Sequence, residues 1–276
     1  MKSYLVIPMI LATLLTTYSC TNSQGTSTGN PLVAISMTGA STNATAQLNK
    51  HQFSWLINQA YALTPPSSML DAVSSTVVVS SFWISISEIE FKSAETAGNS
   101  EVDGSDVEFT GPYTINIFDP NPQSLASSEI STNAIRRIKY KTKKVADVSA
   151  GNPAGMVNHT LYVVAAVASK NFTLRSGEEI QYETAGPNLV TFANNQNLLL
   201  EVLTAEIFRK IDLTNVTNNA VIDESNKINA TGACPTIDAS ANDIYTCFIK
   251  AIQKQTKVGK DDNGDSELQP SEETIN

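Results

Sequence analysis

The chain has 276 residues, of which 41% are hydrophobic and 16% are charged, and its formal net charge at pH 7 is −9. An acidic balance disfavours nucleic acid and anionic lipid surfaces as partners. The length suits one domain, or one domain with an appendage.

The first segment, residues 1–19, is expected to be a signal peptide. Lys2 supplies a positive start, and Leu5 to Leu15 form an apolar run that is too short to span a bilayer. The following motif, Thr17-Tyr18-Ser19-Cys20, resembles the lipobox of bacterial lipoproteins. This resemblance implies lipidation of Cys20. Ordinary signal peptidase cleavage after Ser19 stays open as the alternative, because Thr17 and Tyr18 are poor matches to a strict lipobox.

Residues 20–31 are rich in Ser, Thr, Gly and Asn, and we expect them to form a flexible tether behind the lipidated cysteine. The folded part should begin near Leu32. A second apolar segment of membrane-spanning length does not occur in the sequence, so we expect the remaining residues to be soluble on the far side of the membrane.

Most apolar segments after Leu32 are short, rich in Val and Ile, and alternate with small polar residues, which is typical of strands with one buried face. Strands and helices do not alternate regularly, which argues against a doubly wound sheet. We therefore expect a mainly β fold, an antiparallel β-sandwich with a few short helices over residues 32–213. The expected strands are Leu32–Met37, Thr76–Ser80, Phe82–Phe91, Tyr113–Phe118, Ile135–Thr142, Leu161–Ala168, Phe172–Leu174, Ile180–Tyr182 and Leu198–Leu203.

The segment Phe82–Phe91 is the clearest strand. Its apolar residues change parity around Glu88, which predicts either a β-bulge at that point or a strand that is covered on both sides. Trp83, within this segment, and Trp55 are expected to lie in the core rather than to serve as sugar platforms.

Helical patterns are few. Phe53–Leu63 and Thr204–Ile211 are expected to form short helices. Residues 214–276 are expected to hold a C-terminal helix at about 240–257, with Ser240 and Asp243 as an N-cap pair, followed by an acidic loop.

Two cysteines remain once Cys20 is assigned to the lipid. Because an exported protein lies in an oxidising compartment, Cys234 and Cys247 are expected to form a disulfide. Two separate buried thiols are the alternative, since sequence spacing does not determine the distance between the Cα atoms.

The acidic loop at residues 261–272 is similar to the calcium loop of EF-hands, in which oxygen ligands at positions 1, 3, 5, 7, 9 and 12 surround the ion. Ser266 departs from the pattern because it replaces the glycine of the sharp turn. The alternative is an acidic, disordered C-terminal tail. The calcium ligands that the pattern predicts are Asp261, Asn263, Asp265, Glu267, Gln269 and Glu272.

A basic run is the strongest charge feature of the otherwise acidic chain, and Arg137, Lys139, Lys141 and Lys143 should share one strand face. This stripe could bind phosphate, lipopolysaccharide or acidic glycans, or it could protect the edge of a sheet against aggregation. Glu88 and Glu90 should also share a face. We interpret this pair as solvated rather than catalytic, because the motifs of known hydrolases and metalloenzymes do not occur in the sequence.

Three segments resemble bacterial lipoproteins that contain the domain of unknown function DUF4382: Phe82–Phe91, Gly111–Ile117 and Arg136–Lys141. The resemblance covers roughly Leu32 to Leu213. It implies a β-sandwich of the transthyretin-like or carbohydrate-binding-like kind, and it implies no established activity.

These features together predict an exported, lipid-anchored protein of the bacterial cell envelope, at the outer membrane, in the periplasm or at the surface. Its expected role is structural or adhesive, with other envelope proteins as partners. A carbohydrate-binding or other ligand-binding module is the alternative, and an enzyme of unfamiliar kind is the least favoured class.

Overall fold

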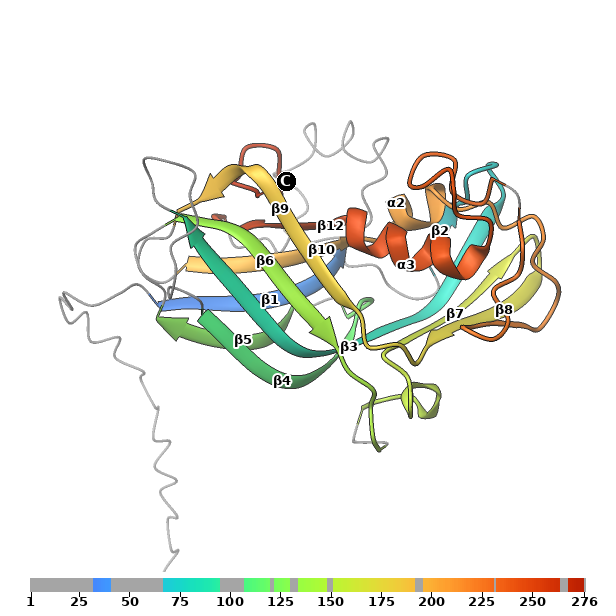
Figure 1. The fold of residues 1–276 in the computed structure, drawn as a ribbon, viewed down its shortest axis with the longest axis horizontal. Helices are drawn as coiled ribbons and strands as arrows, with labels where there is room; N and C mark the ends of the chain where they lie inside the picture. Colours follow the sequence, from blue (N-terminus) through green and yellow to red (C-terminus); the bar gives the residue numbers. More distant parts are fainter. Residues whose placement is uncertain are drawn as a thin grey trace, which may run out of the picture.

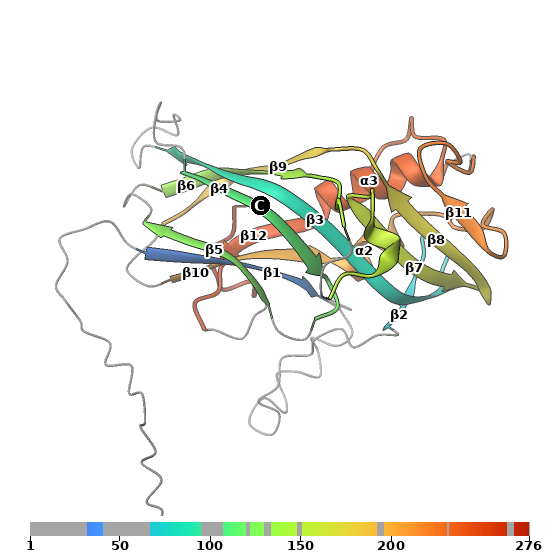
Figure 2. The same ribbon diagram turned by 90° about the horizontal axis from the view of Figure 1, so that it is seen from below.

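A computed structural model of the chain describes residues 32–40, 67–94, 107–119, 122–129, 134–147, 151–191, 196–230, 232–263 and 268–275. The expected signal peptide, Cys20, the tether, Trp55 and the helix at Phe53–Leu63 lie outside these residues. In the described part the strands form two curled sheets that lie as two layers (Figure 1, Figure 2). The predicted mainly β, sandwich-like fold is therefore confirmed.

The described strands divide into a four-stranded and an eight-stranded sheet. The smaller sheet has the order β12 (Thr256–Lys260), β10 (Gln196–Leu203), β1 (Leu32–Ala40), β5 (Gln123–Glu129). The larger sheet has the order β11 (Ala220–Ile222), β8 (Lys170–Ser176), β7 (Leu161–Val167), β3 (Thr76–Ala94), β6 (Ala134–Thr142), β9 (Gln181–Val190), and β2 (Ser67–Leu70) and β4 (Val107–Asn116) also pair with β3.

The long strand β3 joins the two ends of the larger sheet. Its first half pairs with β2 and β7, and its second half pairs with β4 and β6. The two strands expected at Thr76–Ser80 and Phe82–Phe91 are thus one strand. Its pairing register shifts between Ile86 and Glu88, so the predicted β-bulge is confirmed. Trp83 is half-buried and does not belong to the core, because it points to the face of the sheet opposite to Phe82 and Ile84.

Most strand pairs are antiparallel, as predicted, but β1 pairs with β10 in parallel and β11 pairs with β8 in parallel. A parallel pair needs a long connection between its strands. The strands β1 and β10 have such a connection, because they lie at opposite ends of the sandwich segment.

The C-terminal helix α3 (Ile244–Lys254) packs into the main core. The ring of Phe248 lies 5.8 Å from that of Phe82 on β3 and 5.5 Å from that of Phe208 on the short helix α2 (Thr204–Arg209). A short 3-10 helix, η1 (Ala154–Met156), precedes β7. The residues after 213 therefore complete the same core, and β12 completes the smaller sheet.

Helix α3 is shorter than the expected range of about 240–257. Its N-cap is Asp243, whose side chain accepts the N–H of Thr246 at 2.7 Å. Ser240 does not cap the helix, since its hydroxyl donates to Asp238. The helix ends at Lys254 because Thr256 already belongs to β12.

Candidate functional site

The candidate site is an open hollow between β9 and the C-terminal end of α3. Its volume is about 470 Å³, within the range of roughly 300–1,000 Å³ that is typical of ligand sites. We call it the seam hollow, because it lies where β9 of the larger sheet approaches β12 of the smaller one. It is lined by Glu183, Thr184, Ala185, Lys210, Thr236, Ile237, Gln253, Lys254 and Gln255.

Strand β9 forms the first wall. Tyr182 and Thr184 face the core, so Glu183 and Ala185 point outward. The Tyr182 ring stacks on Tyr140 at 5.0 Å, and the Tyr140 hydroxyl lies 3.3 Å from Oγ1 of Thr256. Burial raises the pKa of Tyr140 well above its usual range, so this hydroxyl stays protonated. These contacts connect β9 through β6 to the start of β12.

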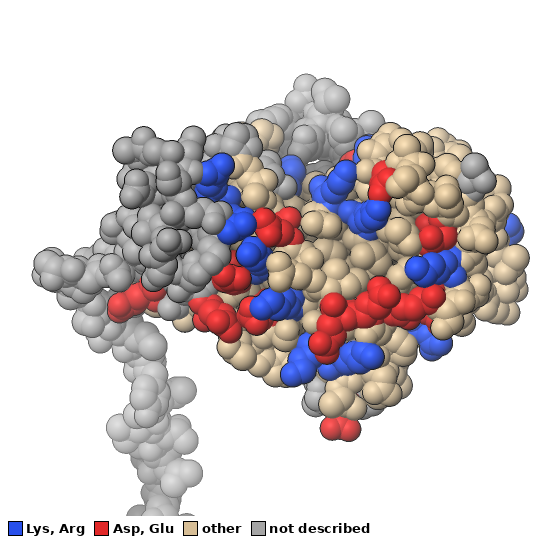
Figure 3. Space-filling view, viewed as in Figure 1, with Lys and Arg blue, Asp and Glu red and all other residues tan. Residues whose placement is uncertain are grey.

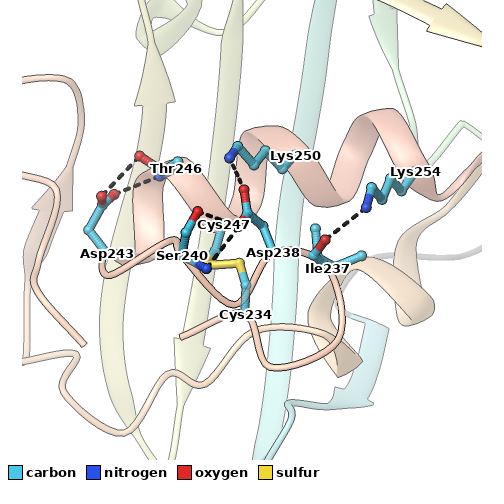
Figure 4. The surroundings of a disulfide bond; sticks show 9 residues. All are labelled: Cys234, Ile237, Asp238, Ser240, Asp243, Thr246, Cys247, Lys250 and Lys254. Carbon is cyan, nitrogen blue, oxygen red and sulfur yellow. Dashed lines mark hydrogen bonds and ion pairs between the residues drawn. A yellow bond between two sulfur atoms is a disulfide. The ribbon is translucent and has the colours of Figure 1, made fainter. Parts of the chain in front are cut away.

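The second wall is a loop held under α3 by a disulfide (Figure 4). Cys234 and Cys247 are joined, with their Cα atoms 5.5 Å apart, so the expected pair is present in the structure. Asp238 accepts a hydrogen bond from Lys250, and Lys254 donates to the carbonyl of Ile237 at 2.8 Å. The hydrogen bond from Lys250 is the main reason that the pKa of Asp238 lies well below its usual range. The loop that contributes Thr236 and Ile237 is thus fixed at several points.

The predicted basic stripe adjoins the hollow on the outer face of the larger sheet. Arg137, Lys139 and Lys141 lie on the outer face of β6, as expected, and Lys143 is exposed just beyond the end of the strand. Arg136 sits where the pairing of β6 with β9 is irregular. This bulge explains why Ile135 and Ile138, three residues apart, are both buried.

Carboxylates on both neighbouring strands lie opposite the cations of this stripe. Lys141 lies opposite Glu88 and forms an ion pair with it, and this hydrogen bond raises the pKa of Lys141. Lys139 lies between Glu90 on β3 and Glu183 on β9. The expected pair Glu88 and Glu90 does share one face, and we call the resulting surface the charged ladder, formed by Glu88, Glu90, Arg137, Lys139, Lys141 and Glu183.

Arg137 and Glu183 complete the ladder with a distance of 3.3 Å between Nη1 and Oε1. In Figure 3, blue and red atoms interleave over the area of β6 and β9. The edge-protection interpretation of the stripe is wrong, because β6 lies between β3 and β9 and is not an edge strand. As an anion site the stripe is offset by carboxylates, since Glu88, Glu90 and Glu183 lie opposite its cations.

The acidic loop is described only in part, and Asp265 and Glu267 lie outside the described residues. The Glu272 carboxylate accepts the N–H of Gln269 at 2.7 Å and that of Asp262 at 3.0 Å, and so joins the two ends of the loop. Burial raises the pKa of Glu272 despite these bonds. Among the described residues no group of three or more His, Cys, Asp or Glu side chains could hold a metal ion. Calcium binding by Asp261, Asn263, Gln269 and Glu272 stays a prediction.

The residues after this loop fold back onto β12. Leu268 and Ile275 are buried, and the N–H of Ile275 donates to the carbonyl of Val258 at 2.9 Å. The alternative of a disordered acidic tail is therefore wrong for residues 268–275.

A second polar cluster lies at the other end of α3. The Tyr245 hydroxyl lies 2.9 Å from Glu178 and 3.2 Å from Glu224. Burial raises the pKa of Tyr245 well above its usual range. The Glu224 carboxylate also accepts the N–H groups of Gly177 and Glu178. This pattern, in which one carboxylate ties several backbone groups together, indicates a structural brace between α3, β8 and the segment after β11.

Comparisons with protein-family models, with curated proteins and with solved structures found no match. The resemblance to the DUF4382 lipoproteins is thus not tested by them and stays a prediction. Within the described residues, no helix has both the length and the apolar character that crossing a membrane requires.

Most of the seam hollow could not be identified from the sequence. Its lining comes from β9, the end of α2, the disulfide loop and the end of α3, and no local pattern connects these segments. The expected disulfide was the one available signal, because it places the residues near Cys234 beside α3.

Proposed function

We propose that this protein is exported, anchored to the bacterial cell envelope through a lipid on Cys20, and contacts other envelope proteins with the charged ladder and the adjoining seam hollow. The observation that carries the protein-contacting part of this proposal is the charged ladder, whereas the anchor rests on the motif Thr17-Tyr18-Ser19-Cys20. Charges of both signs alternate across β3, β6 and β9, and such a surface suits recognition of a protein with a complementary pattern better than binding of a polyanion.

The hollow supports the same proposal. It is open and mostly polar, and it shares Glu183 with the ladder, so the two form one continuous surface. Its walls are fixed by the disulfide and by the hydrogen bond from Lys254 to Ile237. A surface that is ordered before binding loses less conformational entropy when a partner binds.

The anchor is tested by labelling cells with a palmitate analogue and comparing the parent chain with Cys20→Ser. The parent should carry the label and partition with the membrane fraction, and Cys20→Ser should do neither. A parent protein that carries no label and stays in the soluble fraction would favour ordinary cleavage after Ser19.

The protein-contacting face is tested by photo-crosslinking in intact cells. A benzophenone amino acid replaces Lys139 in the ladder, and in a matched variant it replaces Val221, which is exposed on β11 of the same sheet. We expect discrete protein adducts from position 139 and none from position 221. Equal patterns from both positions would contradict the proposal.

A ligand-binding module is the second candidate, and the volume and polar lining of the hollow favour it. A glycan array probed with the full chain distinguishes the two. Saturable glycan binding that is lost in Gln253→Ala would favour the ligand-binding module.

A further inference from the structure

We propose that the seam hollow binds an extended acidic peptide segment of a partner protein, which pairs with the outer edge of β9. This inference rests on the proposed protein-contacting function and specifies the kind of segment that the site accepts. Three observations support it: the direction of the backbone groups of β9, the charge of the hollow, and the way in which the chain fills the other end of the same seam.

The backbone of β9 directs hydrogen-bonding groups toward the hollow. The N–H of Thr142 donates to the carbonyl of Ile180 at 2.9 Å, which makes these two residues a hydrogen-bonded pair of the β6–β9 ladder. Because such pairs alternate in an antiparallel ladder, Tyr182 and Thr184 also bond to β6, and the backbone groups of Glu183 and Ala185 point away from it.

That outward side of β9 is an edge of the larger sheet. Among the residues that the structure describes, none forms a backbone hydrogen bond with Glu183 or Ala185 from that side. Both residues line the hollow. An exposed edge of this kind accepts an extended peptide as an additional strand, and the backbone hydrogen bonds provide the affinity.

The charge of the hollow selects an acidic segment. Lys210 and Lys254 line it, and the one acidic lining residue, Glu183, already pairs with Arg137 at 3.3 Å. Lys254 uses one N–H to reach the carbonyl of Ile237, and an ammonium group has three donors. The hollow is therefore a cationic site within a chain whose net charge is −9.

The chain itself forms contacts of this kind between the ends of β9 and β12. The segment at residues 273–275 lies along β12 in an extended form, with the N–H of Lys260 donating to the carbonyl of Glu273 at 2.9 Å. The Glu273 carboxylate then accepts the N–H of Thr191, next to the end of β9, at 3.1 Å and lies 3.5 Å from Nζ of Lys260. An extended acidic segment thus already bridges the two sheets, and the hollow offers the same kinds of contact at a place that none of the described residues fills.

The probe is a blocked, fluorescein-labelled pentapeptide of alternating valine and glutamate, and its binding to the full chain is measured by fluorescence anisotropy. We expect saturable binding that weakens about tenfold in Lys210→Glu and stays unchanged in Lys144→Glu, an exposed lysine outside the hollow. Circular dichroism confirms that each variant is folded.

Two further comparisons separate strand pairing from charge attraction. The same peptide with alternate amides methylated should not bind, because it lacks the N–H groups that pair with β9. Ala185→Pro should also abolish binding while the fold is kept, since the N–H that it removes points away from β6.

Absence of saturable binding overturns the inference, and so does equal binding of the methylated peptide or an equal loss in Lys144→Glu. The proposed function has its own readout in the cross-links from position 139. Cross-links from that position without peptide binding would overturn the peptide inference alone, whereas absence of both would remove the proposed function as well.

Discussion

Lys254, at the C-terminal end of α3, donates a hydrogen bond from Nζ to the main-chain carbonyl of Ile237 at 2.8 Å. The two residues lie 17 positions apart: Ile237 is within the loop that the Cys234–Cys247 disulfide closes, and Lys254 is beyond it. The loop is therefore attached to α3 at two points, covalently at Cys247 and by this hydrogen bond at the C-terminal end of the helix. Lysine near a helix C-terminus also interacts favourably with the helix dipole.

Removal of the disulfide should destabilise the whole domain, because α3 packs into the main core. We expect the double change Cys234→Ala and Cys247→Ala to lower the free energy of unfolding by about 3 kcal/mol, the typical effect of closing a loop of this size. Urea unfolding followed by fluorescence measures this loss. The parent chain in reductant should unfold at the same urea concentration as the double variant in the absence of reductant, and a stable parent under reducing conditions would contradict the prediction.

Truncation of Phe248 should have a larger effect. Its ring is 1% exposed and contacts the rings of Phe82 and Phe208, so Phe248→Ala leaves a cavity between α3, β3 and α2. Such changes cost about 3 to 5 kcal/mol. Gln253→Ala on the exposed side of the same helix is the control and should change the stability by less than about 0.5 kcal/mol. Thermal unfolding of the two variants compares these values directly.

The Tyr245 hydroxyl should contribute to stability. Tyr245→Phe keeps the buried ring and removes the contacts with Ser176, Glu178 and Glu224, which should cost about 1 to 3 kcal/mol because polar groups lose their partner. Chemical unfolding measures the loss. The variant Glu178→Gln should weaken the same brace, and additive losses in the double variant would show that the two residues act independently.

Glu224 should make the stability depend on acid pH. Burial tends to raise the pKa of this carboxyl, but hydrogen bonds from backbone groups, Ser176 and Tyr245 outweigh it and lower the pKa below its ordinary value of 4.5. A lowered folded-state pKa contributes stability above pH 4.5, and this contribution is lost as the pH falls through the folded-state value. Unfolding free energies of the parent and Glu224→Gln should therefore converge as the pH falls below 4.5. A constant difference down to pH 3 would rule out this role.

The acidic loop yields a test that separates its two possible roles. The calcium-loop interpretation predicts heat that saturates on calcium titration, with a dissociation constant of about 0.1 to 1 mM, and that vanishes in the double variant Asp261→Ala and Glu272→Ala. The observed bonds of Glu272 predict in addition that Glu272→Gln destabilises the C-terminal residues in the presence of a chelator. Hydrogen exchange at Val258 and Lys260 reports this second effect, and calorimetry that shows no heat from the parent would leave Glu272 with the bracing role alone.

Elements whose pattern lies within one segment could be predicted from the amino-acid sequence. Alternation in the Phe82–Phe91 segment predicted the strand and offered a bulge as one of two explanations of its parity change, and the helical pattern at about 240–257 predicted α3. The strands β2, β11, β5 and β12 were missed, and of these β5 and β12 belong to the smaller sheet. Their segments, QSLASSE and TKVGK, have weak apolar alternation, and they are strands because β1 and β10 supply the hydrogen-bonding partners.

The site, in contrast, depends on how distant segments pack. The stripe on β6 was visible in the sequence, but its carboxylate partners depend on the register with β3 and β9. The hollow brings Glu183, Lys210, Thr236 and Lys254 together from segments that are far apart in the chain. Local periodicity indicates which side of an element is buried. The groups that face each other between two elements depend instead on how distant segments pack, and the pattern of a single segment does not predict that packing.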